Sequence, residues 1–156
     1  EMAPPPVAPA PVPELPEFDM HQRARGEARA TGLWFSAHPL AAPELAAARR
    51  GAIACADLEH HVGRRVALVG LTCAYRRVET KRGGPMLFVT IADATGLAEG
   101  TLFTGAYRAW GPAARASVVR LEGRVEAALD AITLNVDRVV ALDGTAPAGH
   151  PPFPLA

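Results

Sequence analysis

Apolar and polar residues alternate along the second half of the chain, with a spacing of two that is typical of half-buried β-strands. In the run 117–126, Val119, Leu121 and Val125 fall on one side, whereas charged residues fall on the other. Applied to the whole second half, the pattern predicts five strands bounded by glycine and Asp/Gly turns. We expect them at 65–79, 86–92, 97–104, 117–126 and 132–142.

The connections between these strands suggest how they are arranged. Gly70 lies in the middle of a long first strand and predicts a barrel-corner bend or a bulge there. Residues 105–115, with Tyr107 and Trp110, predict a short helical connection. Three strands, a helix and two more strands is the element order of an OB-fold, a five-stranded Greek-key barrel. We therefore predict a mainly β protein with short helices, in which a small helical segment precedes the barrel.

The first half of the chain carries helix signals instead. Asp19 is a plausible N-cap for a helix over 19–30, and Gly32 stands just past its end. Pro43 suits the first position of a second helix over 44–50. The predicted organisation is a proline-rich linker (1–17), a short helical segment (18–62), the barrel (63–143) and a flexible tail (144–156).

Charge is uneven along the chain although the total is zero. Residues 1–62 contain five Arg/Lys against eight Asp/Glu, a balance of −3, and residues 63–143 contain eleven against eight, a balance of +3. The predicted barrel is thus the basic half, which favours a polyanionic partner. Cys55 and Cys73 lack CxxC spacing and predict a reduced, cytosolic setting. We expect no signal peptide and no membrane span, and a chain that opens on Glu1 suits a fragment or a processed protein.

The histidines and acidic residues form no evident reactive centre. His38 precedes a proline and is expected to stabilise a turn by bonding a backbone carbonyl. Asp93 is expected to cap its loop, with Gly96 at positive φ. We predict no metal site, no catalytic residues and no cofactor, because ligands and nucleophile–base pairs lack suitable spacing.

Two blocks of sequence resemble the C-terminal portion of the bacterial DNA polymerase III α subunit, the C-family replicative and error-prone polymerases. Residues 30–40, ATGLWFSAHPL, are similar to that family's glycine, apolar, serine-x-histidine-proline-leucine segment. Residues 80–96, TKRGGPMLFVTIADATG, are similar to its OB-fold signature. The likeness covers roughly residues 14–142. It implies a bacterial, cytoplasmic and nucleoid-associated protein of DNA replication or repair.

The resemblance and the strand pattern together indicate a nucleic-acid surface. Phe88 is opposite in parity to Leu87 and Val89, so it is expected to face outward and stack on a base. For Phe103 we expect core packing. The cations would contact phosphates, although an ordinary solvated surface remains the alternative, above all for Arg120 and Arg124. The predicted nucleic-acid-binding residues are Tyr75, Arg76, Arg77, Lys81, Arg82, Phe88, Arg120 and Arg124.

The chain also departs from that family. The polymerase palm with its metal-binding aspartates is missing, and phosphoryl transfer requires carboxylates that hold metal ions. We therefore expect no polymerase activity from this chain by itself. Three hypotheses remain open: a noncatalytic OB module that binds single-stranded DNA, a protein-interaction adaptor that docks a polymerase holoenzyme or repair partner, and a degenerate gene fragment with no independent role.

Overall fold

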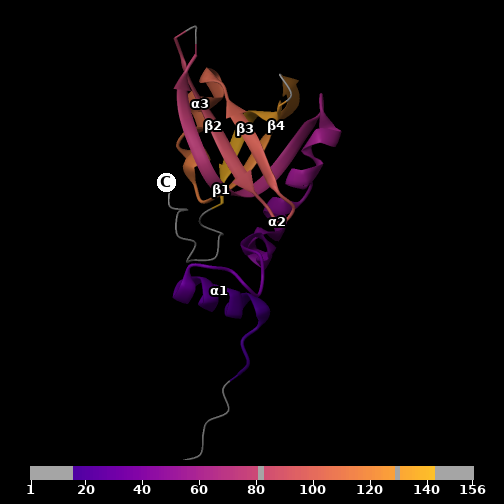
Figure 1. Ribbon diagram of the computed structural model, residues 1–156, viewed down its shortest axis with the longest axis vertical. Helices are drawn as coiled ribbons and strands as arrows, with labels where there is room; N and C mark the ends of the chain where they lie inside the picture. Colours follow the sequence, from indigo (N-terminus) through magenta and orange to yellow (C-terminus); the bar gives the residue numbers. More distant parts are fainter. Residues whose placement is uncertain (1–15, 81–82, 129–130, 143–156) are drawn as a thin grey trace, which may run out of the picture.

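Five strands form a closed barrel in the order β1-β2-β3-β5-β4 (Figure 1). The computed structural model describes residues 16–80, 83–128 and 131–142. Neighbouring strands are antiparallel except β3 and β5, which pair in parallel through Gly100 and Thr101. This is the OB-fold topology, as predicted. The elements are β1 (Arg65–Glu79), β2 (Pro85–Ala92), β3 (Leu97–Leu102), helix α3 (Thr104–Trp110), the 3₁₀ turn η4 (Ala113–Arg115), β4 (Val118–Ala128) and β5 (Ala131–Ala141).

Strand β1 belongs to two ladders because it bends. Its first part pairs with β4 as far as Leu71, and its second part pairs with β2. The β1–β2 register slips between Thr72 and Ala74, so the irregularity lies at Cys73 rather than at Gly70. Gly70 has a packing role instead, since a Cβ there would lie 2.8 Å from the Cβ of Ile91.

The barrel interior is filled by the apolar residues that the alternation predicted. Leu121, Val125 and Leu134 are fully buried in it. The alternation in β5 changes phase after Val136, because Glu122 pairs with Arg138 whereas Gly123 pairs with Val136. Gly123 is required at this bulge, since a Cβ there would lie 2.0 Å from the carbonyl oxygen of Asn135.

Short helices make up the segment before the barrel. Asp19 caps α1 (Met20–Thr31) in a capping box with Gln22, and Gly32 ends it at φ 76°, as predicted. The helix expected over 44–50 is divided into a 3₁₀ turn and one α-helical turn. The elements after α1 are η1 (Pro39–Ala41), η2 (Pro43–Leu45), α2 (Ala46–Arg49) and η3 (Cys55–His61).

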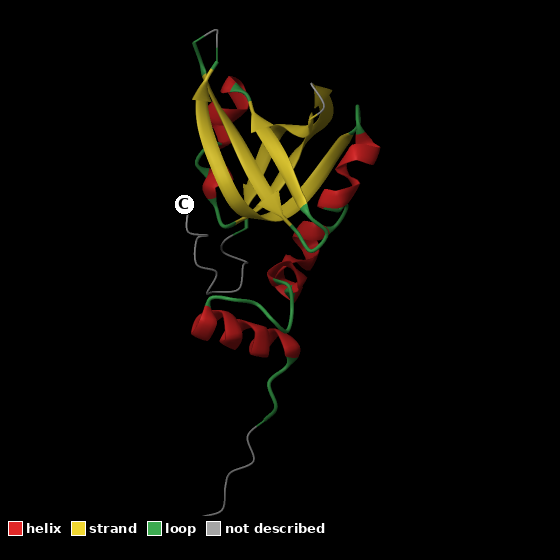
Figure 2. Ribbon diagram, in the orientation of Figure 1, coloured by secondary structure: helices red, strands yellow, loops and turns green. Residues whose placement is uncertain are grey.

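This segment covers part of the barrel's outer surface. Leu40 and Leu45 pack against Val69, Leu71 and Val118, which point away from the barrel interior. The front of β2 and β3 carries no helix (Figure 2). Across residues 16–80, 83–128 and 131–142, no helix has the length and apolar character needed to span a membrane. The barrel therefore has one covered and one uncovered outer face.

Candidate nucleic-acid interface

A row of side chains crosses the strands on the outer face of the barrel. The registers pair Arg76 with Phe88, Phe88 with Thr101, Thr101 with Asn135, and Asn135 with Arg124. Directly paired residues project from the same face of a sheet, and neighbouring strands lie about 4.8 Å apart. We call these five residues the outer belt. It places Phe88, Thr101 and Asn135 between two arginines; Thr101 is only 5% exposed, and Asn135 donates to Glu126 at 3.0 Å, so Phe88 and the two arginines are its more accessible members.

Arg76 and Phe88 form the most developed part of the outer belt. The Arg76 guanidinium carbon lies 4.9 Å from the centroid of the Phe88 ring. Phe88 is half-buried while Leu87 and Val89 are fully buried, so its predicted outward orientation is confirmed. A guanidinium stacked on a ring still presents N–H donors in its plane. The pair therefore offers N–H groups that can donate hydrogen bonds to a phosphate, next to an aromatic ring.

Tyr75 and Arg77 lie on the opposite face of the same hairpin. They pair with Val89 and Leu87, the inward-facing residues of β2. In Figure 1, α3 lies behind this hairpin. The Arg77 guanidinium lies 5.8 Å from the Tyr107 ring of α3, and that of Arg115 lies 5.4 Å from the Tyr75 ring. The structure thus divides neighbouring predicted residues between two faces; Lys81 and Arg82 lie outside the described residues.

Arg120 and Arg124 differ although both lie on β4. The Arg120 side chain is only 19% exposed and donates to the carbonyl oxygens of Ala48 (2.6 Å) and Arg50 (3.2 Å). Its Nε also donates to Glu122 at 2.7 Å. These contacts give Arg120 a structural role, and we therefore remove it from the interface predicted from sequence. Arg124 is exposed and, among the described residues, forms no ion pair.

Phe103 corrects another expectation. Its side chain is 47% exposed, so the predicted core packing is wrong. The residue follows Leu102, which is fully buried, and alternation turns the next side chain outward. The sequence did not predict Thr101 and Asn135 as members of the site, because a neutral polar residue does not indicate which residues lie beside it on the adjacent strands. Only the strand pairing reveals them as members of the outer belt.

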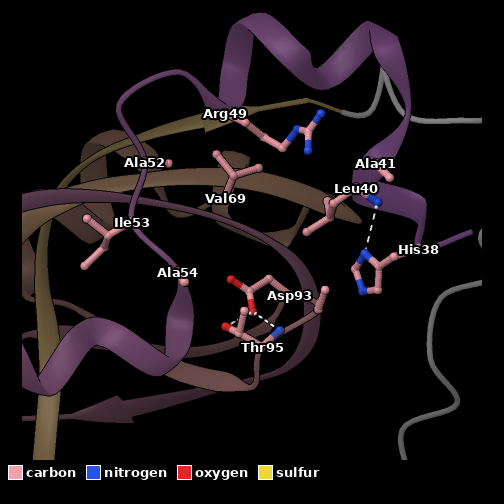
Figure 3. Close-up of a pocket in the computed structure, with 11 residues that line it drawn as sticks. His38, Leu40, Ala41, Arg49, Ala52, Ile53, Ala54, Val69, Asp93 and Thr95 are labelled. Carbon is pink, nitrogen blue, oxygen red and sulfur yellow. Dashed lines mark hydrogen bonds between the residues drawn. The ribbon is translucent and has the colours of Figure 1, made fainter.

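A separate pocket of about 260 Å³ lies where the helical segment meets the barrel. Figure 3 shows His38 and Leu40 on one side and Asp93 with Thr95 on another. The Nδ1 atom of His38 accepts a hydrogen bond from the Leu40 N–H at 3.2 Å, so its turn role is confirmed but its partner is not a carbonyl. Burial lowers the pKa of His38, and the Asp93 charge opposes that shift.

Asp93 joins the β2–β3 turn to the start of η3. Its carboxylate accepts from the backbone N–H groups of Thr95 (2.7 Å), Gly96 (3.1 Å) and Cys55 (2.8 Å), which confirms the predicted cap. Gly96 does not take the expected positive φ. The side chain of Asp93 closes the turn, so no left-handed residue is needed. Burial raises the pKa of Asp93, but hydrogen bonds from Thr95 and Cys55 outweigh it and the net shift is downward.

The remaining candidates for reactive chemistry among the described residues are the cysteine thiols and groups of possible metal ligands. Burial, together with the Asp93 carboxylate, raises the pKa of the Cys55 thiol to about 12, so it stays protonated. Within the part of the chain that the structure describes, no three His, Cys, Asp or Glu side chains are grouped to hold a metal ion. Among the described residues, these side chains supply neither a reactive thiol nor a cluster of metal ligands.

Comparison with known proteins agrees with the sequence signature. The chain is 29% identical over 131 residues to DNA polymerase III subunit alpha of Bacillus subtilis, which covers 83% of this chain and 12% of that subunit. The predicted resemblance is confirmed. The chain therefore spans about an eighth of the length of the curated relative it matches. No family model matches the chain.

Solved structures with similar folds come from several kinds of protein. Asparaginyl-tRNA synthetase from Pyrococcus horikoshii superposes with a TM-score of 0.49 at 20% identity, covering 58% of this chain and 22% of the synthetase. The mitochondrial single-stranded DNA binding protein Rim1 of S. cerevisiae gives 0.42 at 14% identity, covering 50% of this chain and 92% of Rim1. A replication protein A domain from Methanococcus maripaludis gives 0.36 at 16%, covering 50% and 82%.

Proposed function

We propose that this chain is a noncatalytic OB-fold module that holds single-stranded DNA during replication or translesion synthesis. It would act as part of a DNA polymerase III α subunit or as a protein derived from one, in the bacterial cytoplasm at the nucleoid. The observation that carries the proposal is the outer belt, in which Arg76 and Arg124 flank Phe88, Thr101 and Asn135.

The belt suits a strand laid across the barrel rather than along one β-strand. Phe88 would stack on a base, since every base has an aromatic face, and this contact needs no particular sequence. Arg76 and Arg124 would contact phosphates near the two ends of the belt. Counterions released at those phosphates would make the affinity depend on salt. The module binds DNA in this scheme and contributes no step of phosphoryl transfer.

Fluorescence anisotropy with labelled oligo-dT tests this proposal. Phe88→Ala is expected to remove about 1–3 kcal/mol of stacking, which is roughly a 5- to 150-fold loss of affinity. Arg76→Gln is expected to reduce the slope of log K against log salt by about 0.7, the value for one phosphate contact on a single strand. Unchanged affinity and slope in both variants would overturn the proposal.

The matched control removes charge far from the belt. Arg23 and Arg29 are exposed on α1, and the double substitution Arg23→Gln with Arg29→Gln changes the net charge without touching the barrel. It is expected to leave oligo-dT binding unchanged. An equal loss in this control would mean that overall charge, rather than the belt, determines the affinity.

An adaptor that docks a polymerase or repair protein is the second candidate function. It is favoured by four exposed apolar side chains at the ends of α1 and in the loop after it, Phe18, Met20, Leu33 and Phe35. Four large apolar side chains exposed within residues 18–35 are the kind of surface that a protein partner would cover. If oligo-dT binding is absent even at low salt, this function replaces DNA binding.

A further inference from the structure

The β1–β2 hairpin carries arginine–aromatic pairs on both of its faces, and only one face belongs to the outer belt. Arg76 lies over Phe88 on the outer face. On the inner face, Arg115 lies over Tyr75 and Arg77 lies over Tyr107. We call Tyr75, Arg77, Tyr107 and Arg115 the inner surface.

The inner surface is accessible to a ligand. The Tyr75 side chain is 41% exposed, that of Arg77 is 55% exposed, and Arg115 is also exposed. Tyr107 packs partly against the core and supports the Arg77 side chain. Arg77 also pairs with Glu79 at 3.1 Å, but an exposed ion pair of this kind contributes little and exchanges readily for a phosphate.

The two faces meet at an open strand edge. β1 pairs with β4 as far as Leu71, and Thr72 still bonds to the Ala116–Ser117 turn. Beyond that point, in the described part of the chain, β1 pairs with β2 alone. Arg76 and Arg77 are consecutive residues, so they stand on the two sides of this edge. A ligand at the Arg76 end of the belt can therefore reach the inner surface by crossing one strand.

We propose that a single strand of DNA leaves the outer belt at Arg76, crosses the free edge of β1 and continues on the inner surface. Tyr75 would supply a second stacking platform there, and Arg77 and Arg115 would contact phosphates. This inference rests on the proposed function, because the outer belt is the first part of the track. It predicts two contact zones that are occupied in turn as the oligonucleotide becomes longer.

Oligonucleotide length separates the two zones. Labelled oligo-dT of about 5 and about 16 nucleotides, near the limits of site sizes for one OB-fold, would be titrated by anisotropy at several salt concentrations. The Arg77→Gln, Arg115→Gln variant is expected to bind the long oligonucleotide at least about tenfold more weakly. Its salt slope with that oligonucleotide should fall by about 1.4, or about 0.7 for each lost phosphate contact. Binding of the short oligonucleotide should change less than about twofold.

The other possible outcomes distinguish failure of the further inference from failure of the proposed function. If the inner variant binds both oligonucleotides like the unmodified protein, the further inference is overturned while the outer belt stands. If it weakens both lengths equally, the inner surface is part of the minimal site and the proposed order of contacts is wrong. If Phe88→Ala and Arg76→Gln leave both lengths unaffected, the proposed function itself fails. The Arg23→Gln, Arg29→Gln control and melting curves of each variant exclude effects of net charge and of unfolding.

Discussion

Arg76 and Arg120 are both arginines on the outer face of the same barrel, yet their surroundings differ. Arg120 lies beneath α2, where it donates to two backbone carbonyls and to Glu122. Arg76 lies on the uncovered face, with its guanidinium over Phe88. The position within a strand therefore does not decide an arginine's role. The deciding factor is whether another element packs over that part of the sheet.

The difference extends from these two residues to the two faces that hold them. The covered face buries apolar side chains such as Val69, Leu71 and Val118 beneath the helical segment. The uncovered face keeps polar and aromatic side chains at the same outward positions. Because the helical segment occupies one of the two outer faces, a ligand on the outside of the barrel is restricted to the other. Substitutions on the covered face should therefore lower stability, and substitutions on the uncovered face should lower affinity for oligo-dT.

Leu45→Ala should damage the covered face most. Leu45 is fully buried between the helical segment and the barrel, so its truncation leaves a cavity and is expected to cost about 2–5 kcal/mol of unfolding free energy. Urea unfolding measures this loss. Leu33→Ala is the control, because that side chain is 58% exposed and its removal should change stability by less than about 0.5 kcal/mol. Equal effects would mean that the helical segment is not integrated with the barrel.

Arg120→Ala should lower stability but not DNA affinity, whereas Arg124→Ala should lower DNA affinity but not stability. Removal of Arg120 leaves two carbonyls and Glu122 without their donor, so we expect a loss of about 1.5–3 kcal/mol in stability and unchanged affinity for oligo-dT. Arg124→Ala should weaken oligo-dT binding and change stability by less than about 0.5 kcal/mol. Unfolding curves measure the stability of both variants, and anisotropy measures their affinity for oligo-dT. A loss of affinity in Arg120→Ala, or a loss of stability in Arg124→Ala, would contradict the assignment of one role to each arginine.

Lys81→Ala with Arg82→Ala tests two of the nucleic-acid-binding residues predicted from the sequence. Both cations follow directly from the strand that carries Arg76, so we predict that they contact phosphates. Their removal should weaken oligo-dT binding on the order of tenfold and lower the salt slope by about 1.4. Anisotropy at two salt concentrations measures both quantities. An unchanged salt slope would mean that neither Lys81 nor Arg82 contacts a phosphate.

A weak pH dependence should come from the junction between the two regions. The pKa of His38 is lowered by burial, so the unfolded chain takes up a proton before the folded protein does. The contribution of neutral His38 to the free energy of unfolding is therefore complete above the ordinary histidine pKa of about 6.5, and it declines as the pH falls below that value. His38→Asn keeps a capping side chain but does not titrate. Urea unfolding at about pH 7.5 and about pH 5.5 should show a smaller decline in this variant.

Strand alternation predicted much of the fold because each strand has to bury one side. It located the strands, the connecting helix and the outward orientation of Phe88. The expectation of core packing for Phe103 was wrong because it did not follow this alternation: Phe103 comes after the inward-facing Leu102 and therefore faces outward. Alternation also gave no account of Cys73 as the site of the bulge, since the slip in register depends on the partner strand rather than on local sequence.

The sequence by itself determined the five strands of the barrel, the Asp19 and Gly32 caps of α1 and the Asp93 cap of the β2–β3 turn. These depend on local periodicity and turn chemistry, which act between residues close in the chain. Tertiary structure alone decided which cations meet which aromatic rings, because pairing between strands sets those contacts. It left Arg76 over Phe88 on the uncovered face and buried Arg120 under α2. For the same reason Thr101 became a neighbour of Phe88, and Asn135 a neighbour of Thr101, although these residues are far apart in sequence.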